Sequence, residues 1–155
     1  MTFQVSVCGP RHCTDEDARN AHRVGELLAE SGTVVICGGG SGVMAAVAAG
    51  ARSRNGTVIG IRPNNSKEGA SPDLTATIVT NMGEARNAII VWSADAVISV
   101  GGSWGTLSEI ALARRRGDVP VISLAGWRVM GPDGEEVPGI EHTVTPEEAV
   151  SLALG

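Results

Sequence analysis

The chain has 155 residues, enough for one ordinary domain with a hydrophobic core, and its 43% hydrophobic and 19% charged content excludes a disordered protein. A formal net charge of −5 argues against a nucleic-acid partner, which needs a basic surface to neutralise backbone phosphates. No apolar run approaches the roughly 18 residues of a membrane span, and the N-terminus has no secretory pattern. We therefore expect a cytoplasmic protein without a membrane partner.

The three cysteines, an odd number, fit a reducing compartment. Cys8, Cys13 and Cys37, together with His12, can be imagined as a metal cluster. Neither C-x-x-C nor H-x-x-x-H occurs, however, so we predict no metal site and no cofactor required for folding.

Short apolar strands alternate with helices along most of the chain. We predict strands over 3–8, 34–37, 57–61, 75–80, 96–100 and 119–124, and helices over 14–32, 43–52, 84–93 and 106–116. In the tail, residues 127–137 surround the turn Pro132-Asp133-Gly134 and predict a hairpin or loop excursion. Thr145 then caps a last short helix, with Pro146 at its first position.

This alternation predicts an α/β fold, a Rossmann-like, doubly wound parallel sheet with helices on both faces, in three layers and one domain over residues 1–155. Ligands bind such sheets at the carboxyl ends of the strands. Three turns fall on that edge: the first begins at Gly9, and the glycine-rich ones span 38–42 and 101–106.

Each glycine-rich turn opens a helix, where backbone N–H groups favour an anion, most often a phosphate. Neither turn is a Walker loop, because no Gly-Lys-Ser/Thr follows. A dinucleotide oxidoreductase is disfavoured, because the 38–42 turn follows the second strand and Ile61-Arg62 stands where an acid would grip the ribose. The turns therefore predict a small phosphorylated ligand.

Arg86 and Glu109 lie on either side of the predicted strand 96–100. Arg86 stands at a helix start, where a cation opposes the helix dipole unless an anion faces it; an ion pair across two helices is the alternative. Glu109 fits a capping box that begins at Thr106, and ligand contact or catalysis is its alternative. Trp104 either stacks on a base or pterin ring or packs against a second subunit.

These motifs resemble the lysine-decarboxylase-like or "lonely guy" superfamily, whose signature is Pro-Gly-Gly-x-Gly-Thr-x-x-Glu with an upstream arginine. The residues in register are Gly102, Gly105, Thr106, Glu109 and, upstream, Arg86, while Gly101 replaces the proline and Ser103 a glycine. The segment 38–44 resembles the family's earlier G-G-G-x-x-G-x-M turn, with one residue fewer. The Ala-Arg-Asn form at 85–87 is most similar to the sister branch of molybdenum-cofactor carrier proteins, and the resemblance covers residues 3–125.

The resemblance implies a carrier that holds the molybdenum cofactor, a molybdopterin, as cargo. The alternative is a nucleoside 5′-monophosphate phosphoribohydrolase of the cytokinin-activating type, in which Arg86 and Glu109 would be catalytic and Glu109 would stabilise an oxocarbenium-like sugar. The resemblance does not imply a lysine decarboxylase, because no lysine is placed to hold a pyridoxal Schiff base. The predicted ligand-binding residues are Gly9, Gly39, Gly40, Ser41, Gly42, Met82, Arg86, Asn87, Gly101, Gly102, Ser103, Trp104, Gly105 and Thr106.

The segment 88–92 reads Ala-Ile-Ile-Val-Trp and is more apolar than one buried helix face requires. The resemblance implies assembly through such helices. We therefore expect a homodimer or homotetramer.

Overall fold

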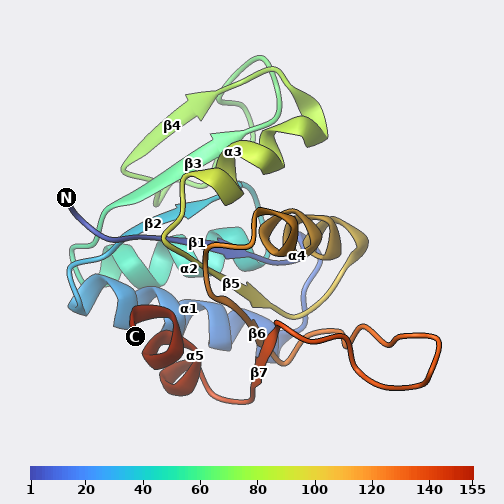
Figure 1. Ribbon diagram of the computed structural model, residues 1–155. Coiled ribbons are helices and arrows are strands. Elements are labelled where there is room, and N and C mark those ends of the chain that lie inside the picture. The colour runs from blue at the N-terminus through green and yellow to red at the C-terminus, as the bar shows by residue number, and fades with distance from the viewer.

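Seven parallel strands form one sheet in the computed structural model, which describes all 155 residues (Figure 1). The strands are β1 (Gln4–Cys8), β2 (Val34–Cys37), β3 (Val58–Arg62), β4 (Ala76–Val79), β5 (Ala96–Val100), β6 (Val121–Leu124) and β7 (Glu141–Thr143). Their order across the sheet is β4-β3-β2-β1-β5-β6-β7. The prediction of a Rossmann-like parallel α/β fold is confirmed.

Helices cover both faces of the sheet (Figure 1). On one face lie α1 (Asp15–Glu30), α2 (Val43–Ser53) and α5 (Pro146–Leu154), whose Val24, Val47 and Ala149 share a core with strand side chains. On the other face lie α3 (Arg86–Trp92) and α4 (Trp104–Arg116), which contribute Ile90 and Ile110 to a second core. Strands buried on both sides explain the unbroken apolar runs in the sequence.

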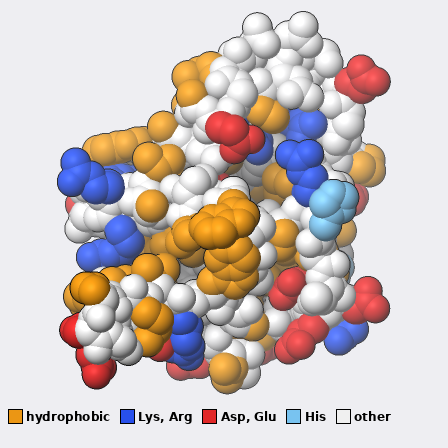
Figure 2. Space-filling model, turned by 90° about the vertical axis from the view of Figure 1, so that its right-hand side faces the viewer, with side chains coloured by type: hydrophobic (Ala, Val, Ile, Leu, Met, Phe, Trp, Pro, Cys, Tyr) orange, Lys and Arg blue, Asp and Glu red, His pale blue; other side chains and the backbone are white.

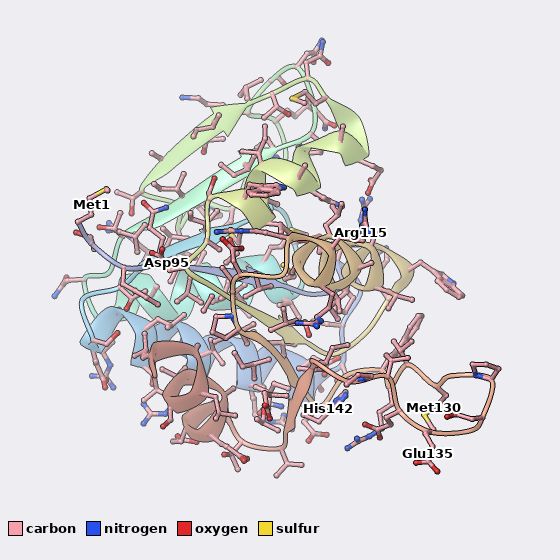
Figure 3. All side chains as sticks on the ribbon, in the orientation of Figure 1. Met1, Asp95, Arg115, Met130, Glu135 and His142 are labelled. Carbon is pink, nitrogen blue, oxygen red and sulfur yellow. The ribbon has the colours of Figure 1, made fainter.

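The tail differs most from its prediction. The excursion after β6 is confirmed by an antiparallel bridge between Met130 and Glu136, and it extends away from the sheet (Figures 1 and 3). It is followed by β7, a strand that the sequence did not predict, which pairs with β6. The three residues of β7 are Glu141, His142 and Thr143, and only Thr143 is buried, so no apolar run marks the strand.

Helices α3 and α4 begin at residues other than those predicted. The segment predicted to be helical from residue 84 opens with a 3-10 turn (Gly83–Ala85), and α3 proper begins at Arg86. Helix α4 begins two residues before its predicted start, at Trp104, because the Ser103 hydroxyl accepts a hydrogen bond from the Thr106 N–H and takes the N-cap. The predicted capping box from Thr106 to Glu109 is therefore wrong, since Glu109 is the sixth helical residue and lies one turn beyond the cap.

The strand order brings three turns to one place. The chain runs outward from β1 to β4 and then returns to the other side of β1 with β5. The turns after β1, β2 and β5 therefore meet at the carboxyl edge, at a topological switch point. Asp95 lies at the opposite edge, on the same side as Met1, where its carboxylate accepts from the Gln4 N–H (Figure 3).

Candidate functional site

A cleft of about 610 Å³ opens at this switch point. Its walls come from the turn after β1, the end of β2, the start of α2, the start of α3 and the start of α4. The lining residues are Cys8, Gly9, Pro10, Arg11, His12, Gly38, Met44, Glu84, Arg86, Asn87, Gly102, Ser103, Trp104, Gly105, Thr106 and Glu109. Segments distant in the sequence thus share one concave surface, the usual form of a small-molecule site.

The start of α4 presents unused hydrogen-bond donors to the cleft. The N–H groups of Gly102, Ser103, Trp104 and Gly105 donate to no protein acceptor, and all four residues line the cleft. The next N–H, that of Thr106, is satisfied by the Ser103 hydroxyl at 3.2 Å. Successive free amides at the positive end of a helix favour an anion with several acceptor oxygens.

Arg86 is fixed by the backbone of two neighbouring strands. Its Nη1 donates to the carbonyl oxygens of Gly38 at 2.9 Å and Ile61 at 2.6 Å, and its Nε donates to the Asn87 side-chain oxygen at 2.9 Å. No carboxylate lies within ion-pair distance of the guanidinium, so the predicted alternative of an ion pair across two helices is not found. The positive charge is therefore positioned but not neutralised by a direct partner.

Asn87 holds Arg86 in this orientation. Besides accepting from Arg86, the Asn87 amide nitrogen donates to the Ser108 hydroxyl at 3.2 Å, and the side chain is 3% exposed. Both ends of the amide are thus engaged within the protein. Asn87 lines the cleft, but its contacts are those of a residue that positions Arg86.

Glu109 lies in the cleft as a carboxyl group with altered acidity. Burial raises the pKa of Glu109 to about 7, against the opposing effects of a hydrogen bond with the Cys8 thiol and of the Arg86 charge. Burial, reinforced by the Glu109 charge, raises the pKa of the Cys8 thiol well above its usual value. Cys8 therefore stays a neutral thiol near pH 7, while Glu109 can both hold and release a proton there.

Two indole rings stand beside the free amides. Trp104, 78% exposed, packs edge to face against Trp127, with ring centroids 5.2 Å apart. Figure 2 shows exposed hydrophobic side chains near the centre of this face, with basic side chains and a histidine beside them. A flat apolar surface thus adjoins a donor-rich turn, an arrangement suited to a ring that carries a phosphate.

The turn 38–42 is built differently. Gly40 and Ser41 line a second cavity of about 170 Å³, with Arg11, Met44, Arg62, Pro63, Asn64, Gly69 and Arg86. Gly42 has φ +66°, and its α-carbon packs against the carbonyl groups of Pro10 and Arg11. Gly39, with φ +72°, packs closely against Arg62, Gly60 and Leu74, where a Cβ would be crowded. Gly39 and Gly42 therefore serve close packing and line neither cavity.

The structure distributes the residues predicted from sequence over three groups. Nine line the main cleft: Gly9, Arg86, Asn87, Gly102, Ser103, Trp104, Gly105, Thr106 and Glu109. Gly40 and Ser41 line the second cavity. Gly39, Gly42, Met82 and Gly101 line neither one. Met82 precedes the 3-10 turn and is 49% exposed, and Gly101, with φ +69°, packs against Asp17.

Sequence reasoning missed several lining residues, chiefly Arg11, His12, Met44, Arg62 and Glu84. Arg11 and His12 had a usable signal, since they follow the first strand on the predicted ligand edge. Arg62 also stands at a strand end, where the sequence indicated only that no acid is present to bind an NAD ribose. Met44 ends the segment 38–44 that resembles the family's G-G-G-x-x-G-x-M turn, but it was not assigned to the site. Nothing local marks Glu84.

No three potential metal-ligating side chains lie together anywhere in the structure. Cys8 and Cys37 are buried and Cys13 is half-buried. No helix of the chain combines the length and apolar character that a membrane span requires.

Comparison with known proteins gives a consistent set of relatives. The model of the SLOG cluster4 family matches residues 2–150. An uncharacterized protein of Archaeoglobus fulgidus is 44% identical over 157 residues, which cover 98% of this chain and 95% of that protein. The molybdenum cofactor binding protein of Rippkaea orientalis shares 34% identity at a TM-score of 0.89, with 98% of this chain and 95% of that chain covered. The molybdenum cofactor carrier protein of Chlamydomonas reinhardtii shares 27% identity at a TM-score of 0.81, over 97% and 95% of the two chains.

Proposed function

The chain belongs to the SLOG cluster4 family, and from that premise we propose that it binds a phosphorylated pterin or nucleotide-like ligand as a molybdenum-cofactor carrier does. The observation that carries the proposal is the row of free amides from Gly102 to Gly105, which faces the same cleft as the unneutralised Arg86. The family match confirms the resemblance to the lonely guy superfamily. The identity of the ligand is our inference.

The proposed binding mode assigns one end of the ligand to each feature of the cleft. The phosphate accepts from the free amides at the start of α4, where the helix dipole favours negative charge. Arg86, which lines the same cleft, adds positive charge with a geometry already set by its carbonyl partners. The ring system lies against Trp104 at the mouth of the cleft, where an indole face offers stacking area.

A matched pair of variants at Trp104 tests the role of the amides. Trp104→Ala and Trp104→Pro both remove the indole, but only proline removes the backbone N–H, and a helix tolerates proline at its first position. We expect the proline variant to bind molybdenum cofactor roughly tenfold more weakly than the alanine variant, the usual worth of a charge-assisted hydrogen bond. The pterin retained after dialysis, oxidised to its fluorescent form, measures the difference. Equal retention by the two variants would show that the Trp104 amide does not hold the ligand.

A second candidate function, the phosphoribohydrolase, is favoured by one observation, the pKa of about 7 at Glu109. A carboxyl group with that pKa in a ligand cleft is suited to proton transfer near neutral pH. The reaction would cleave the N-glycosidic bond of a nucleoside 5′-monophosphate, with ionised Glu109 facing the oxocarbenium-like sugar.

Incubation with AMP and other nucleoside 5′-monophosphates decides between the two functions. A hydrolase releases free base and ribose 5-phosphate, and Glu109→Gln should then lower turnover by roughly 100-fold or more. If the wild-type protein releases no base from any of these substrates, the hydrolase alternative fails and the carrier proposal remains.

We also propose that the protein is a homodimer or homotetramer in solution. Exposed apolar side chains lie on α3 (Trp92, 63% exposed), on edge strand β4 (Ile78, 49%) and at the start of α4 (Trp104). Within the segment 88–92, Ile90 and Val91 are buried in the core, so Trp92 carries most of its exposed apolar surface. Light scattering coupled to gel filtration should give a multiple of 15.8 kDa; a 15.8 kDa particle at micromolar concentration would refute this.

A further inference from the structure

The second cavity is lined by several basic residues and by no acidic residue. Arg11, Arg62 and Arg86 line it, together with Ser41 and Asn64, and no Asp or Glu is among its lining residues. None of the three arginines takes part in an ion pair. In a chain whose net charge is −5, three unpaired arginines around about 170 Å³ form a local concentration of positive charge.

Arg62 is the least satisfied member of this group. It is only 9% exposed, its Nε is buried and has no hydrogen-bond partner, and its two other contacts are long, at 3.4 Å to the carbonyl oxygens of Gly38 and Glu68. Burial, followed by the charges of Arg86 and Arg11, lowers the pKa of Arg62. A buried guanidinium without a counter-charge is costly, and an anion in the adjoining cavity would supply that charge.

The start of α2 adds donors at the same place. The N–H groups of Gly40 and Ser41 donate to no protein acceptor, and both residues line the cavity at the positive end of this 11-residue helix. The backbone there is held by a hydrogen bond from the Ser71 N–H to the Gly39 carbonyl oxygen at 2.9 Å and by another from the Val43 N–H to the Pro10 carbonyl oxygen at 3.1 Å. The donors are therefore preorganised.

We propose that this second cavity binds a tetrahedral oxyanion of the phosphate class, between the guanidinium groups of Arg11, Arg62 and Arg86 and the amides of Gly40 and Ser41. The cavity shares Arg11, Met44 and Arg86 with the main cleft, so the two spaces adjoin. The inference rests on the proposed function and extends it. The site as a whole holds two anionic groups at once, and its ligand class is one with a second anionic group beyond the phosphate at α4.

Inorganic phosphate, titrated into ¹⁵N-labelled protein at constant ionic strength, tests this directly. Amide cross-peaks report on each site separately: Gly40 and Ser41 for the second cavity, Trp104 and Gly105 for the main cleft. Both pairs should shift, each with its own saturation curve, and both should remain shifted together at saturation. The Arg62 Nε–H cross-peak should follow Gly40 and Ser41.

Arg62→Met removes the charge while keeping a long side chain, and it should weaken phosphate binding at Gly40 and Ser41 by roughly tenfold while leaving Trp104 and Gly105 unaffected. Arg19→Met is the matched control, because Arg19 is exposed, lines neither cavity and forms no ion pair, so both curves should stay as in the wild type. Arg11→Met provides a second variant at an exposed position, in case Arg62→Met fails to fold. Since Arg11 lines both cavities, both curves should weaken.

The outcomes separate the two proposals. Two results would overturn the second site. One is that the titration curves at Gly40 and Ser41 do not change in Arg62→Met. The other is that phosphate bound at one site prevents phosphate from binding at the other. If that cavity binds phosphate but Trp104 and Gly105 never shift, the proposed phosphate position at α4 fails and the second site stands.

Discussion

Gly42 and Gly105 stand in the two glycine-rich turns, yet their surroundings have little in common. Gly42 has φ +66° and packs against the Pro10 and Arg11 carbonyl groups, leaving no room for a side chain. Gly105 is helical, and a Cβ there would meet nothing nearer than the Ser103 hydroxyl oxygen at 3.9 Å. Gly42 brings two backbone segments together, whereas Gly105 leaves space above the free amides at the start of α4. Glycine content alone therefore does not identify the residues that face a ligand.

The largest effect is expected at Gly42. Gly42→Ala combines an unfavourable backbone conformation with a collision against backbone atoms, and we expect it to lower the free energy of unfolding by about 3 kcal/mol or more. Urea unfolding measures the loss. Gly32→Ala is the control, because Gly32 also has positive φ (+76°) but open space around its α-carbon, so it should lose only about 1 kcal/mol from strain. Equal losses at the two positions would remove the packing role assigned to Gly42.

The next largest effect on stability is expected at Glu109, which lines the main cleft. Its folded-state pKa of about 7 exceeds the ordinary value of 4.5, so the folded protein binds more protons than the unfolded chain between these pH values. The stability contributed by the protonated carboxyl is complete below pH 4.5 and is lost as pH rises through 7. A glutamine side chain does not ionise, so its contribution to stability does not change over this pH range.

We therefore expect Glu109→Gln to be more stable than the wild type at pH 8, by about 1–3 kcal/mol, and to lose that advantage at pH 4.5. Urea unfolding at the two pH values measures it. A difference between the proteins that does not change with pH would show that the carboxyl group is not desolvated.

The fold was predictable from sequence because apolar strands, glycine stops and helix caps repeat along residues 3–124. The strand β7 was not, because only Thr143 among its residues is buried and its place depends on pairing with β6. In the site, the signature residues around Arg86 and Gly102–Thr106 were found because they are contiguous motifs. Arg62 was not assigned to the site, because its significance lies in the charges of Arg11, from the turn after β1, and Arg86, from the start of α3, which only the fold brings beside it.

The sequence around Glu109 has the spacing of a capping box, but the box does not lie at the start of the helix. Thr106-Leu107-Ser108-Glu109 has the spacing of a capping box, but Ser103, three residues earlier, offers a competing cap. The Ser103 cap allows Gly105 and Thr106 to enter the first turn. The glutamate then points into the cleft rather than back to the cap, and only the three-dimensional structure decides between the two registers.

Ser103→Ala sharpens this assignment. It removes the acceptor for the Thr106 N–H and should lower the free energy of unfolding by about 1 kcal/mol, the usual worth of an N-cap. Ser53→Ala serves as the comparison, since the Ser53 hydroxyl bonds the Gly50 carbonyl oxygen inside α2 and adds nothing to the cap of α4. If Ser103→Ala leaves urea unfolding unchanged, the helix does not depend on this cap.

The smallest effect is expected at Gly105, and its sign is opposite to that at Gly42. Alanine is favoured over glycine within a helix and meets no clash here, so Gly105→Ala should raise the free energy of unfolding by about 0.5–1 kcal/mol. The same methyl group stands above the free amides, in the space assigned to the ligand's phosphate. The variant should therefore be more stable and bind inorganic phosphate at Trp104 more weakly, while Gly40 and Ser41 respond as in the wild type. A more stable variant with unchanged binding at Trp104 would mean that the anion does not approach the helix over Gly105.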